Sequence, residues 1–356
     1  MRRPDAPGRR VPSGRSVPLA LLVTLAAGLP LAACGGDDRD PAAARTSSAM
    51  PPAVTPSGEP PTAHDDSEPP VEQEPTSVRT AATSEAPAAT PSPRAPLQRA
   101  ADAAVRAGGS GTGAAVGTIG PGVVVRAGRA ATHAWSSAKV PVLAAVLRAR
   151  RAGQLSGGRT PTADERRLAT RALTVSDNAA ALALFAELER RFGGVDGASA
   201  QVEEALRAGS GRAIAVNRRR RGSFTTFGQT TLRLTDGVRF YGGLAGSCVL
   251  STEDTRFVLG LMRQVSGDQR WGLGTPAWGA TIGFKGGWGP EAGGRYVAVQ
   301  YGVLRRGSRG VAVAVAADAR GGLEAVTPKL TAMARAMQRA LPPSRWPLLP
   351  KTCPDA

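Results

Sequence analysis

Ser136 and Lys139 stand three residues apart at the start of an apolar run that continues to Leu147. If this run is a helix, the two side chains lie on the same face, and a hydroxyl and an amine share one pocket. Lysine can lose its proton inside a protein whereas arginine cannot, so a desolvated Lys139 is able to act as the base that activates Ser136. The spacing therefore predicts a serine nucleophile with a lysine base.

Lysine and histidine are both scarce in this sequence of 356 residues. Only four lysines occur, and two of them, Lys139 and Lys285, fall within candidate motifs. The two histidines are His64, in a presumed linker, and His133, just before Ser136. A Ser-His-Asp arrangement would therefore have His133 as its single base, and we interpret this residue as a polar surface side chain.

Hydrophobic periodicity predicts the elements that must position these residues. Helices are expected at 97–107, 136–152, 162–173, 179–191, 197–208, 225–241, 252–265 and 328–341. Val-rich and β-branched segments predict strands at 113–119, 123–126, 280–284, 296–304 and 310–316. Strands at both ends with helices between them predict an α+β fold. In it, an antiparallel sheet from the N- and C-terminal segments is flanked by helices and carries an inserted all-α subdomain at about 136–265.

The N-terminal third differs from the rest in composition. Residues 1–33 combine a basic start with an apolar stretch that two prolines interrupt, which is typical of a secretory signal and makes a poor membrane span. The stretch ends in the sequence LAAC, which resembles the lipobox of bacterial lipoproteins and implies lipidation of Cys34. Residues 34–96 are rich in Pro, Ala, Ser, Thr and acids, and we expect a disordered linker. The domain at 97–356 is then extracytoplasmic, anchored by lipid to the outer face of the bacterial cytoplasmic membrane.

The formal charge of +17 is unevenly spread. Residues 1–33 carry +4, residues 34–98 carry −6, and residues 99–356 carry +19. An exported basic domain is expected to face anionic envelope polymers or lipid headgroups, whereas a nucleic-acid partner would need a cytosolic address and is excluded. A surface of solvated arginines is the simpler alternative, and we favour it for the run Arg218–Arg221 as well.

Apart from Cys34, the sequence contains Cys248 and Cys353. An even number of cysteines in an exported domain predicts a disulfide. Two buried thiols are the alternative, but Cys353 lies in a polar tail where a free thiol has no packing reason. We therefore expect Cys248 and Cys353 to pair.

Three short motifs follow one another along the chain. They are Ser136-x-x-Lys139, Ser176-Asp177-Asn178 and Lys285-Gly286-Gly287. Together they resemble the S-x-x-K, S-D-N and K-T-G signature of class A β-lactamases and penicillin-binding proteins, over about residues 97–341. The resemblance implies a β-lactamase-like fold and a serine hydrolase that forms an acyl-enzyme with β-lactam or related peptidoglycan-derived amide or ester substrates. We expect a monomer that needs no cofactor and no metal ion.

The resemblance assigns a role to each matching residue. Ser136 would attack the carbonyl, Lys139 would take its proton, and Ser176 would pass a proton to the leaving nitrogen. The backbone N–H groups of Ser136 and Trp288 would form the oxyanion hole. Lys285 would bias the local field towards an anionic substrate.

Substrate contacts are implied for four further residues. Asn178 would touch the substrate, Gly286 and Gly287 would line it along their strand, and Arg295, on the next strand, would bind a substrate carboxylate. Gly286 stands where the family has Thr or Ser, so a hydroxyl that would also bind this carboxylate is missing.

Two further departures concern the helical part. The interval between the first two motifs is shorter than in typical class A enzymes, which predicts a trimmed subdomain. A β-lactamase would carry a Glu four residues before a loop Asn, but Ala213 precedes Asn217 here, and the nearest acids, Glu203 and Glu204, fall in a predicted helix. We therefore expect acylation with slow deacylation. The alternative is a catalytically impaired envelope-binding or β-lactam-sequestering protein of the same fold.

Overall fold

The computed structural model describes residues 92–350 and Cys353. The predicted signal at 1–33, Cys34 and nearly all of the linker lie outside the described residues. The first described helix, α1 (Arg94–Gly108), begins two residues before the expected end of the linker at residue 96. Within the described ranges, no helix combines the length and the apolar character that a bilayer span requires.

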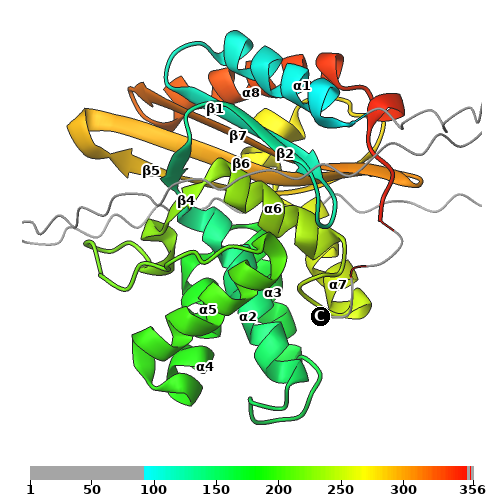
Figure 1. Ribbon diagram of the computed structural model, residues 1–356. Coiled ribbons are helices and arrows are strands. Elements are labelled where there is room, and N and C mark those ends of the chain that lie inside the picture. Colours follow the sequence, from blue (N-terminus) through cyan, green and yellow to red (C-terminus); the bar gives the residue numbers. More distant parts are fainter. Residues whose placement is uncertain (1–91, 351–352, 354–356) are drawn as a thin grey trace, which may run out of the picture. The chain divides into compact units, whose positions relative to one another are not determined.

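A five-stranded antiparallel sheet forms the centre of the fold (Figure 1). It consists of β1 (Thr112–Thr118), β2 (Val124–Gly128), β5 (Thr281–Glu291), β6 (Arg295–Arg306) and β7 (Arg309–Arg320), in the order β2-β1-β7-β6-β5. The first hairpin therefore pairs with the last strand of the chain. This confirms the predicted α+β fold with a sheet built from both ends of the sequence.

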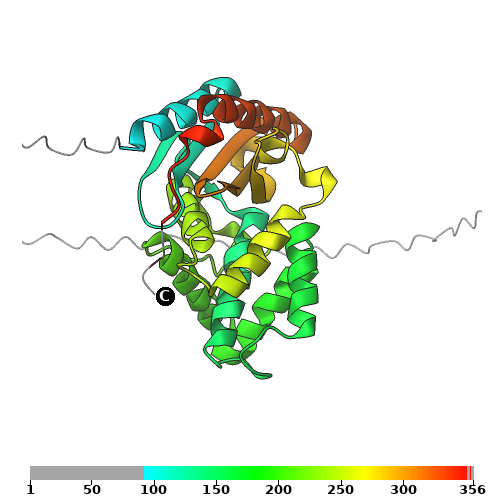
Figure 2. The ribbon, with the colours of Figure 1, turned by 90° about the vertical axis from the view of Figure 1, so that its right-hand side faces the viewer.

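Side chains alternate between the two faces of the sheet along each strand, and each face packs against a separate core. In β7, Val313 and Val315 pack into the core beneath α1 and α8 (Leu323–Ala340), whereas Ala314 and Ala316 belong to the core shared with the helical part. The ribbons show the same layers: α1 and α8 lie together on one face, and α6 lies on the other (Figures 1 and 2).

The helical part is built around α2 (Lys139–Arg151), whose residues Val140–Leu147 are all buried. A helix that is apolar on every side must be enclosed by others. The surrounding helices are α3 (Ala163–Thr174), α4 (Asn178–Phe192), α5 (Gly194–Ser210), α6 (Leu234–Ala245) and α7 (Thr252–Arg263). The helices predicted here are confirmed, with the exception of the one that includes α6.

The predicted helix at 225–241 is wrong in its first half. Residues Phe227–Gln229 form a 3-10 turn, and Thr231–Arg233 form β4, which pairs with β3 (Ala131–His133) in a separate two-stranded sheet. β-Branched threonines favour extended backbone, and an available partner strand decides the outcome. The first strand of the C-terminal meander also runs further than predicted, to Glu291. Because β5 is an edge strand, it tolerates Pro290, which cannot donate a hydrogen bond.

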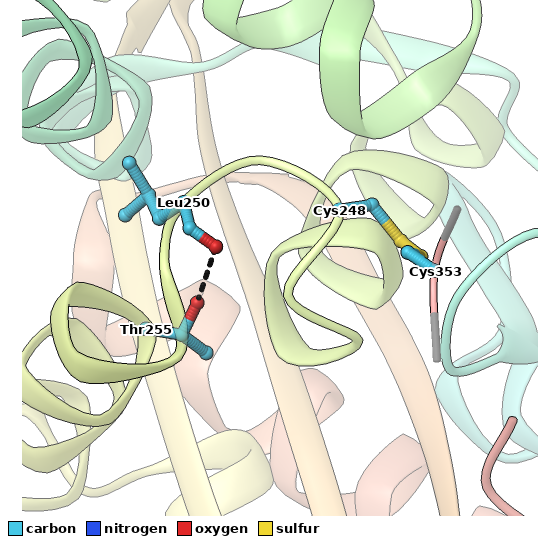
Figure 3. The surroundings of a disulfide bond; sticks show 4 residues. All are labelled: Cys248, Leu250, Thr255 and Cys353. Carbon is cyan, nitrogen blue, oxygen red and sulfur yellow. Dashed lines mark hydrogen bonds between the residues drawn. A yellow bond between two sulfur atoms is a disulfide. The ribbon is translucent and has the colours of Figure 1, made fainter. Parts of the chain in front are cut away.

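A disulfide joins Cys248, in the loop between α6 and α7, to Cys353 (Figure 3). The two Cα atoms are 5.2 Å apart, and 105 residues separate the cysteines in sequence. The Thr255 hydroxyl, in the first turn of α7, donates to the Leu250 carbonyl of this loop at 3.4 Å. The predicted pairing of the two cysteines is confirmed.

Removal of this disulfide should lower the free energy of unfolding by about 3–5 kcal/mol, because the bond closes a long loop in the unfolded chain. We expect this loss for Cys248→Ser/Cys353→Ser, measured by urea denaturation in a Cys34→Ser background. Reduction should destabilise the Cys34→Ser parent by a similar amount and leave the triple variant unchanged. Two free thiols in the unreduced parent would contradict the pairing.

Candidate active site

Ser136 lies in a 3-10 turn, Trp135–Ala138, that continues directly into α2. The Ser137 hydroxyl is buried and donates to the Ala134 carbonyl at 2.5 Å. The Tyr241 hydroxyl donates to the Ser137 carbonyl at 3.0 Å from the side of α6. Ser136 is only partly buried, so of the two adjacent serines it is the one whose hydroxyl can meet a substrate.

Lys139 is the first residue of α2, and its side chain is almost completely buried. Its Nζ donates to the carbonyl oxygen of Ser176 and, at 3.2 Å, to the Ser176 hydroxyl. Burial lowers the pKa of Lys139 to about 8, although the nearby charge of Asp177 acts in the opposite direction. About one tenth of this lysine is therefore neutral at pH 7, and about half at pH 8, as a base requires.

Ser176 sits between α3 and α4 with a left-handed backbone, at φ of 60°. This conformation costs a residue other than glycine roughly 1–2 kcal/mol. The turn is held from both sides, because the Asp177 N–H donates to the Arg171 carbonyl at 3.2 Å and the Asp177 carboxylate accepts from the Ala180 N–H at 3.0 Å. Asn178 begins α4 and is exposed.

Lys285 reaches the same hydroxyl from β5. Its Nζ lies 2.9 Å from Ser176 Oγ, 3.2 Å from the Gly286 carbonyl and 3.5 Å from Gln269 Oε1, and the side chain is fully buried. Burial, and secondly the charge of Lys139, lower the pKa of Lys285 well below its usual value. We call Lys139, Ser176 and Lys285 the lysine–serine cluster.

Gln269 was not predicted from the sequence. It lies in the 3-10 turn Gly267–Gln269 after α7 and is buried beside Lys285. Its carbonyl accepts a hydrogen bond from Gln300 Nε2 at 3.4 Å. A polar residue in an irregular segment carries no periodic or motif signal that could have revealed it.

The strand β5 passes very close to the turn that carries Ser136. A Cβ atom at Gly287 would lie 2.4 Å from the Ala134 carbonyl oxygen and 2.8 Å from the Ser136 nitrogen. At Gly289 it would lie 2.3 Å from the Trp135 ring. Only glycine permits this approach, which brings the backbone that leads into Trp288 beside the backbone of Ser136. The two segments expected to supply the oxyanion hole are therefore adjacent.

Gly286 has different surroundings from Gly287. A Cβ atom there would lie 3.4 Å from Gln300 Cγ and 3.6 Å from ring atoms of both Trp271 and Trp288, which is ordinary contact distance. The position therefore accepts a methyl group without a clash.

The structure does not bring Arg295 or His133 to the lysine–serine cluster. Arg295 forms an ion pair with Asp318, which also binds Arg129. In the strand register, Arg295 lies opposite Glu291, at the other end of β5 from Lys285. His133 Nδ1 lies 2.7 Å from a carboxylate oxygen of Glu291. Both side chains are thus committed to structural contacts.

Both acids considered for deacylation lie on α5, as predicted. Glu203 accepts from Arg218 at 2.7 Å and from the Val216 N–H at 2.9 Å. The side-chain amide of Asn217 donates to the Arg219 and Thr226 carbonyls. Among the described residues, no carboxylate hydrogen-bonds to Ser136 or to either lysine of the cluster.

The arginine run at 218–221 is more structured than a solvated loop. The Arg221 guanidinium lies over the rings of Trp135, at 5.5 Å, and Phe224, at 5.3 Å, and donates to the Pro290 carbonyl at 3.0 Å. Phe224 meets Trp135 edge-on, with ring centroids 5.1 Å apart. Arg221 is exposed, as expected for a solvated run, and in addition two aromatic faces near Ser136 attract its charge.

Searches with the sequence matched no family model and no curated protein. The structure, however, is similar to solved β-lactamases. It matches the TLA-3 extended-spectrum β-lactamase with a TM-score of 0.53 and 13% identity over 68% of this chain and 98% of that chain. A β-lactamase from Burkholderia vietnamiensis gives 0.52 and 19% over 69% and 96%.

A variant of the last common ancestor of class A β-lactamases from Gram-negative bacteria, bound to a transition-state analogue, gives a TM-score of 0.52 and 20% identity over 69% of this chain and 98% of that chain. The similarity extends over nearly the full length of each of these proteins. It confirms the predicted β-lactamase-like fold.

Gly287→Ala should lower the free energy of unfolding by about 1–3 kcal/mol, because the added methyl group collides with backbone atoms that cannot rotate away. The matched control is Gly286→Ala, one residue earlier on the same strand, where the added methyl group meets its neighbours at ordinary contact distance and should destabilise the protein less. Urea denaturation measures both. Equal effects of the two substitutions would contradict the close approach of β5 to Ser136.

Proposed function

We propose that this protein is a serine acyl-transfer enzyme that forms a covalent acyl-enzyme at Ser136 with β-lactams or related envelope amides and esters. The observation that carries the proposal is the convergence of Lys139 and Lys285 on the Ser176 hydroxyl. The partly buried Ser136 lies in the turn that leads directly into Lys139. The β-lactamase-like fold supports the same class of chemistry, and a fold alone does not determine activity.

The acylation step follows from the protonation states of the cluster. Neutral Lys139 takes the proton of Ser136, and Ser136 Oγ forms a bond with the substrate carbonyl carbon. The N–H groups of Ser136 and Trp288 stabilise the negative oxygen of the tetrahedral intermediate. Ser176 then gives its proton to the leaving nitrogen and recovers one from Lys139, so that the C–N bond breaks and an ester remains on Ser136.

Lys285 has a different role in this scheme from the one expected from the sequence. Because burial and the charge of Lys139 both oppose its protonation, it acts mainly as a hydrogen-bond donor that orients Ser176 rather than as a fixed positive charge. Substrate contacts are then left to Asn178 and to the edge of β5 at Gly286 and Gly287.

Hydrolysis of the ester needs a base that activates water, and no described carboxylate hydrogen-bonds to Ser136 or to the cluster lysines. We therefore propose that the acyl-enzyme turns over slowly. This observation also favours the second candidate function, a β-lactam-sequestering or envelope-binding protein that acylates without release or binds without reaction. For either function, we propose that lipid on Cys34 anchors the domain at the outer face of the cytoplasmic membrane, where anionic envelope polymers are further partners.

Incubation with a fluorescent penicillin should add the mass of one intact β-lactam to the protein, measured by intact mass spectrometry at several times. Ser136→Ala should abolish the adduct, whereas Ser137→Ala, which changes the neighbouring buried serine, should retain it. A permanent adduct supports sequestration, and a transient adduct with hydrolysed product supports turnover. An unmodified wild-type protein after long incubation would contradict the proposal.

The acylation rate should rise with pH, because only neutral Lys139 can accept the Ser136 proton. With its pKa at about 8, the rate should increase about fivefold from pH 7 to pH 8 and less than about twofold from pH 8 to pH 9. Stopped-flow fluorescence of the adduct measures the profile. A rate that is independent of pH between 6 and 9 would exclude Lys139 as the base.

A further inference from the structure

The contacts between β5 and the residues around Ser136 follow the alternation of the strand. Residues two apart on a strand point to the same face of the sheet. Gly287 and Gly289 lie on the face that meets the Ser136 turn, and neither position leaves room for a side chain. Glu291 is the next residue on this face and the last of the strand. A contact made by Glu291 therefore continues the same line of contacts.

At Glu291 the contact is made by side chains. A carboxylate oxygen of Glu291 lies 2.7 Å from His133 Nδ1. An ionised carboxylate only accepts hydrogen bonds, so Nδ1 carries the proton in this pair. His133 is the last residue of β3 and stands three residues before Ser136. The pair therefore joins the end of β5 to the chain that leads into the nucleophile.

Trp135, which directly precedes Ser136, has a left-handed backbone with φ of 49°. For a bulky residue this conformation is unfavourable, and it persists only where the surroundings enforce it. The indole ring packs against Gly289, and the His133 ring meets it edge-on, with ring centroids 6.0 Å apart. The strained backbone before the nucleophile is therefore held by residues at the outer end of β5 and by His133.

Arg221 makes a further link at this end of β5. Its guanidinium donates to the Pro290 carbonyl at 3.0 Å and lies 5.5 Å from the centroid of the Trp135 ring. The Arg221 side chain is exposed, and it contacts the ring rather than the backbone of the turn. The hydrogen bond between His133 and Glu291 is therefore the link that acts directly on the chain before the turn.

The close approach of β5 to the Ser136 turn is held at its two ends. In the described ranges, no backbone hydrogen bond crosses between β5 and residues 134–137. The lysine–serine cluster anchors the inner end of the approach, and Glu291 with His133 anchors the outer end. The backbone N–H groups of Ser136 and Trp288 lie between these anchors, so their spacing depends on both.

We propose that His133 and Glu291 are positioning residues for the reaction at Ser136. Their hydrogen bond holds the strained turn of Trp135 against β5 and so fixes the spacing of the two N–H groups that face the developing oxyanion. The role rests on the proposed function, because an oxyanion forms only if Ser136 is acylated. His133 transfers no proton in this scheme, and Glu291 does not touch the substrate.

The concentration dependence of acylation by a fluorescent penicillin tests this role, because it separates binding from the acylation rate constant. His133→Leu should lower the rate constant by about tenfold or more and change the dissociation constant of the non-covalent complex by less than about twofold, because the oxyanion contacts act in the transition state. His133→Asn should stay within about threefold of the wild-type rate constant, because its amide nitrogen takes the place of Nδ1 and still donates to Glu291.

Asparagine cannot act as a base, so His133→Asn also tests proton transfer. Equal losses of rate in His133→Asn and His133→Leu would indicate that the imidazole moves a proton and would overturn the proposal. Glu291→Ala should lower the rate constant like His133→Leu, and the double variant should be no slower than either single variant, because both remove the same bond. Additive losses would show that the two residues do not act as a pair.

The matched control is Arg167→Ala, which removes an exposed ion pair with Asp164 on α3 and should leave the rate constant unchanged. All of these variants should keep an unfolding midpoint close to that of the wild type, since ion pairs that water reaches contribute little to stability. A lower midpoint for His133→Leu with an unchanged rate constant would assign the pair a purely structural role and overturn the proposal.

Hydrogen exchange of the full chain without ligand separates this proposal from the proposed function. Measured by mass spectrometry, His133→Leu should exchange faster than the wild type in peptides 133–138 and 286–291 and equally in α8, whereas His133→Asn should exchange like the wild type throughout. Unchanged exchange in both peptides overturns the proposal, whatever the acylation result. A wild type that exchanges as expected but forms no adduct overturns the proposed function and, with it, the role of the pair in a reaction.

Discussion

Lys139 and Lys285 donate hydrogen bonds to one hydroxyl, that of Ser176, at a place where neither amine is accessible to water. Two ammonium groups that are buried this close together repel each other and have lost their hydration, so the cluster is stable only when the two amines do not both carry a proton. This constraint links three distant segments: the start of α2, the turn between α3 and α4, and β5. The left-handed backbone of Ser176 costs conformational energy. This conformation accompanies the placement of the Ser176 hydroxyl between the two amines.

The second requirement is that β5 approaches the turn of Ser136 without an intervening side chain of its own. Gly287 and Gly289 leave the inner face of β5 flat where the turn of Ser136 and the ring of Trp135 lie against it. On the other side of this turn, Arg221 and Phe224 cover the same ring. Trp135 is thus enclosed by a strand and a loop. These contacts also restrain the position of the adjacent Ser136.

Much of this arrangement could be predicted from the sequence, because the signals were local. Alternation in β7 and the continuous apolar run of α2 defined the layers, and short motifs carried Ser136, Ser176 and Lys285. The failures share one cause, which is contact between residues far apart in sequence. The strand β4 needs β3 as a partner, and Gln269 is recognised only through its contact with Lys285. The ion pair of Arg295 with Asp318 is a further contact of this kind that the sequence did not indicate. The periodicity or composition of one segment cannot indicate which distant residue it will contact.

The pairing of β1 with β7 also joins the two ends of the domain. Gly113 lies opposite Ala316, so the sheet is complete only when nearly the whole domain is present. Contacts between residues far apart in sequence slow the folding of a domain. Lys139 and Ser176 belong to the helical part, whereas Lys285 is contributed by β5, one of the last three strands. A chain cut short before β5 would contain the nucleophile without the environment that controls its protonation.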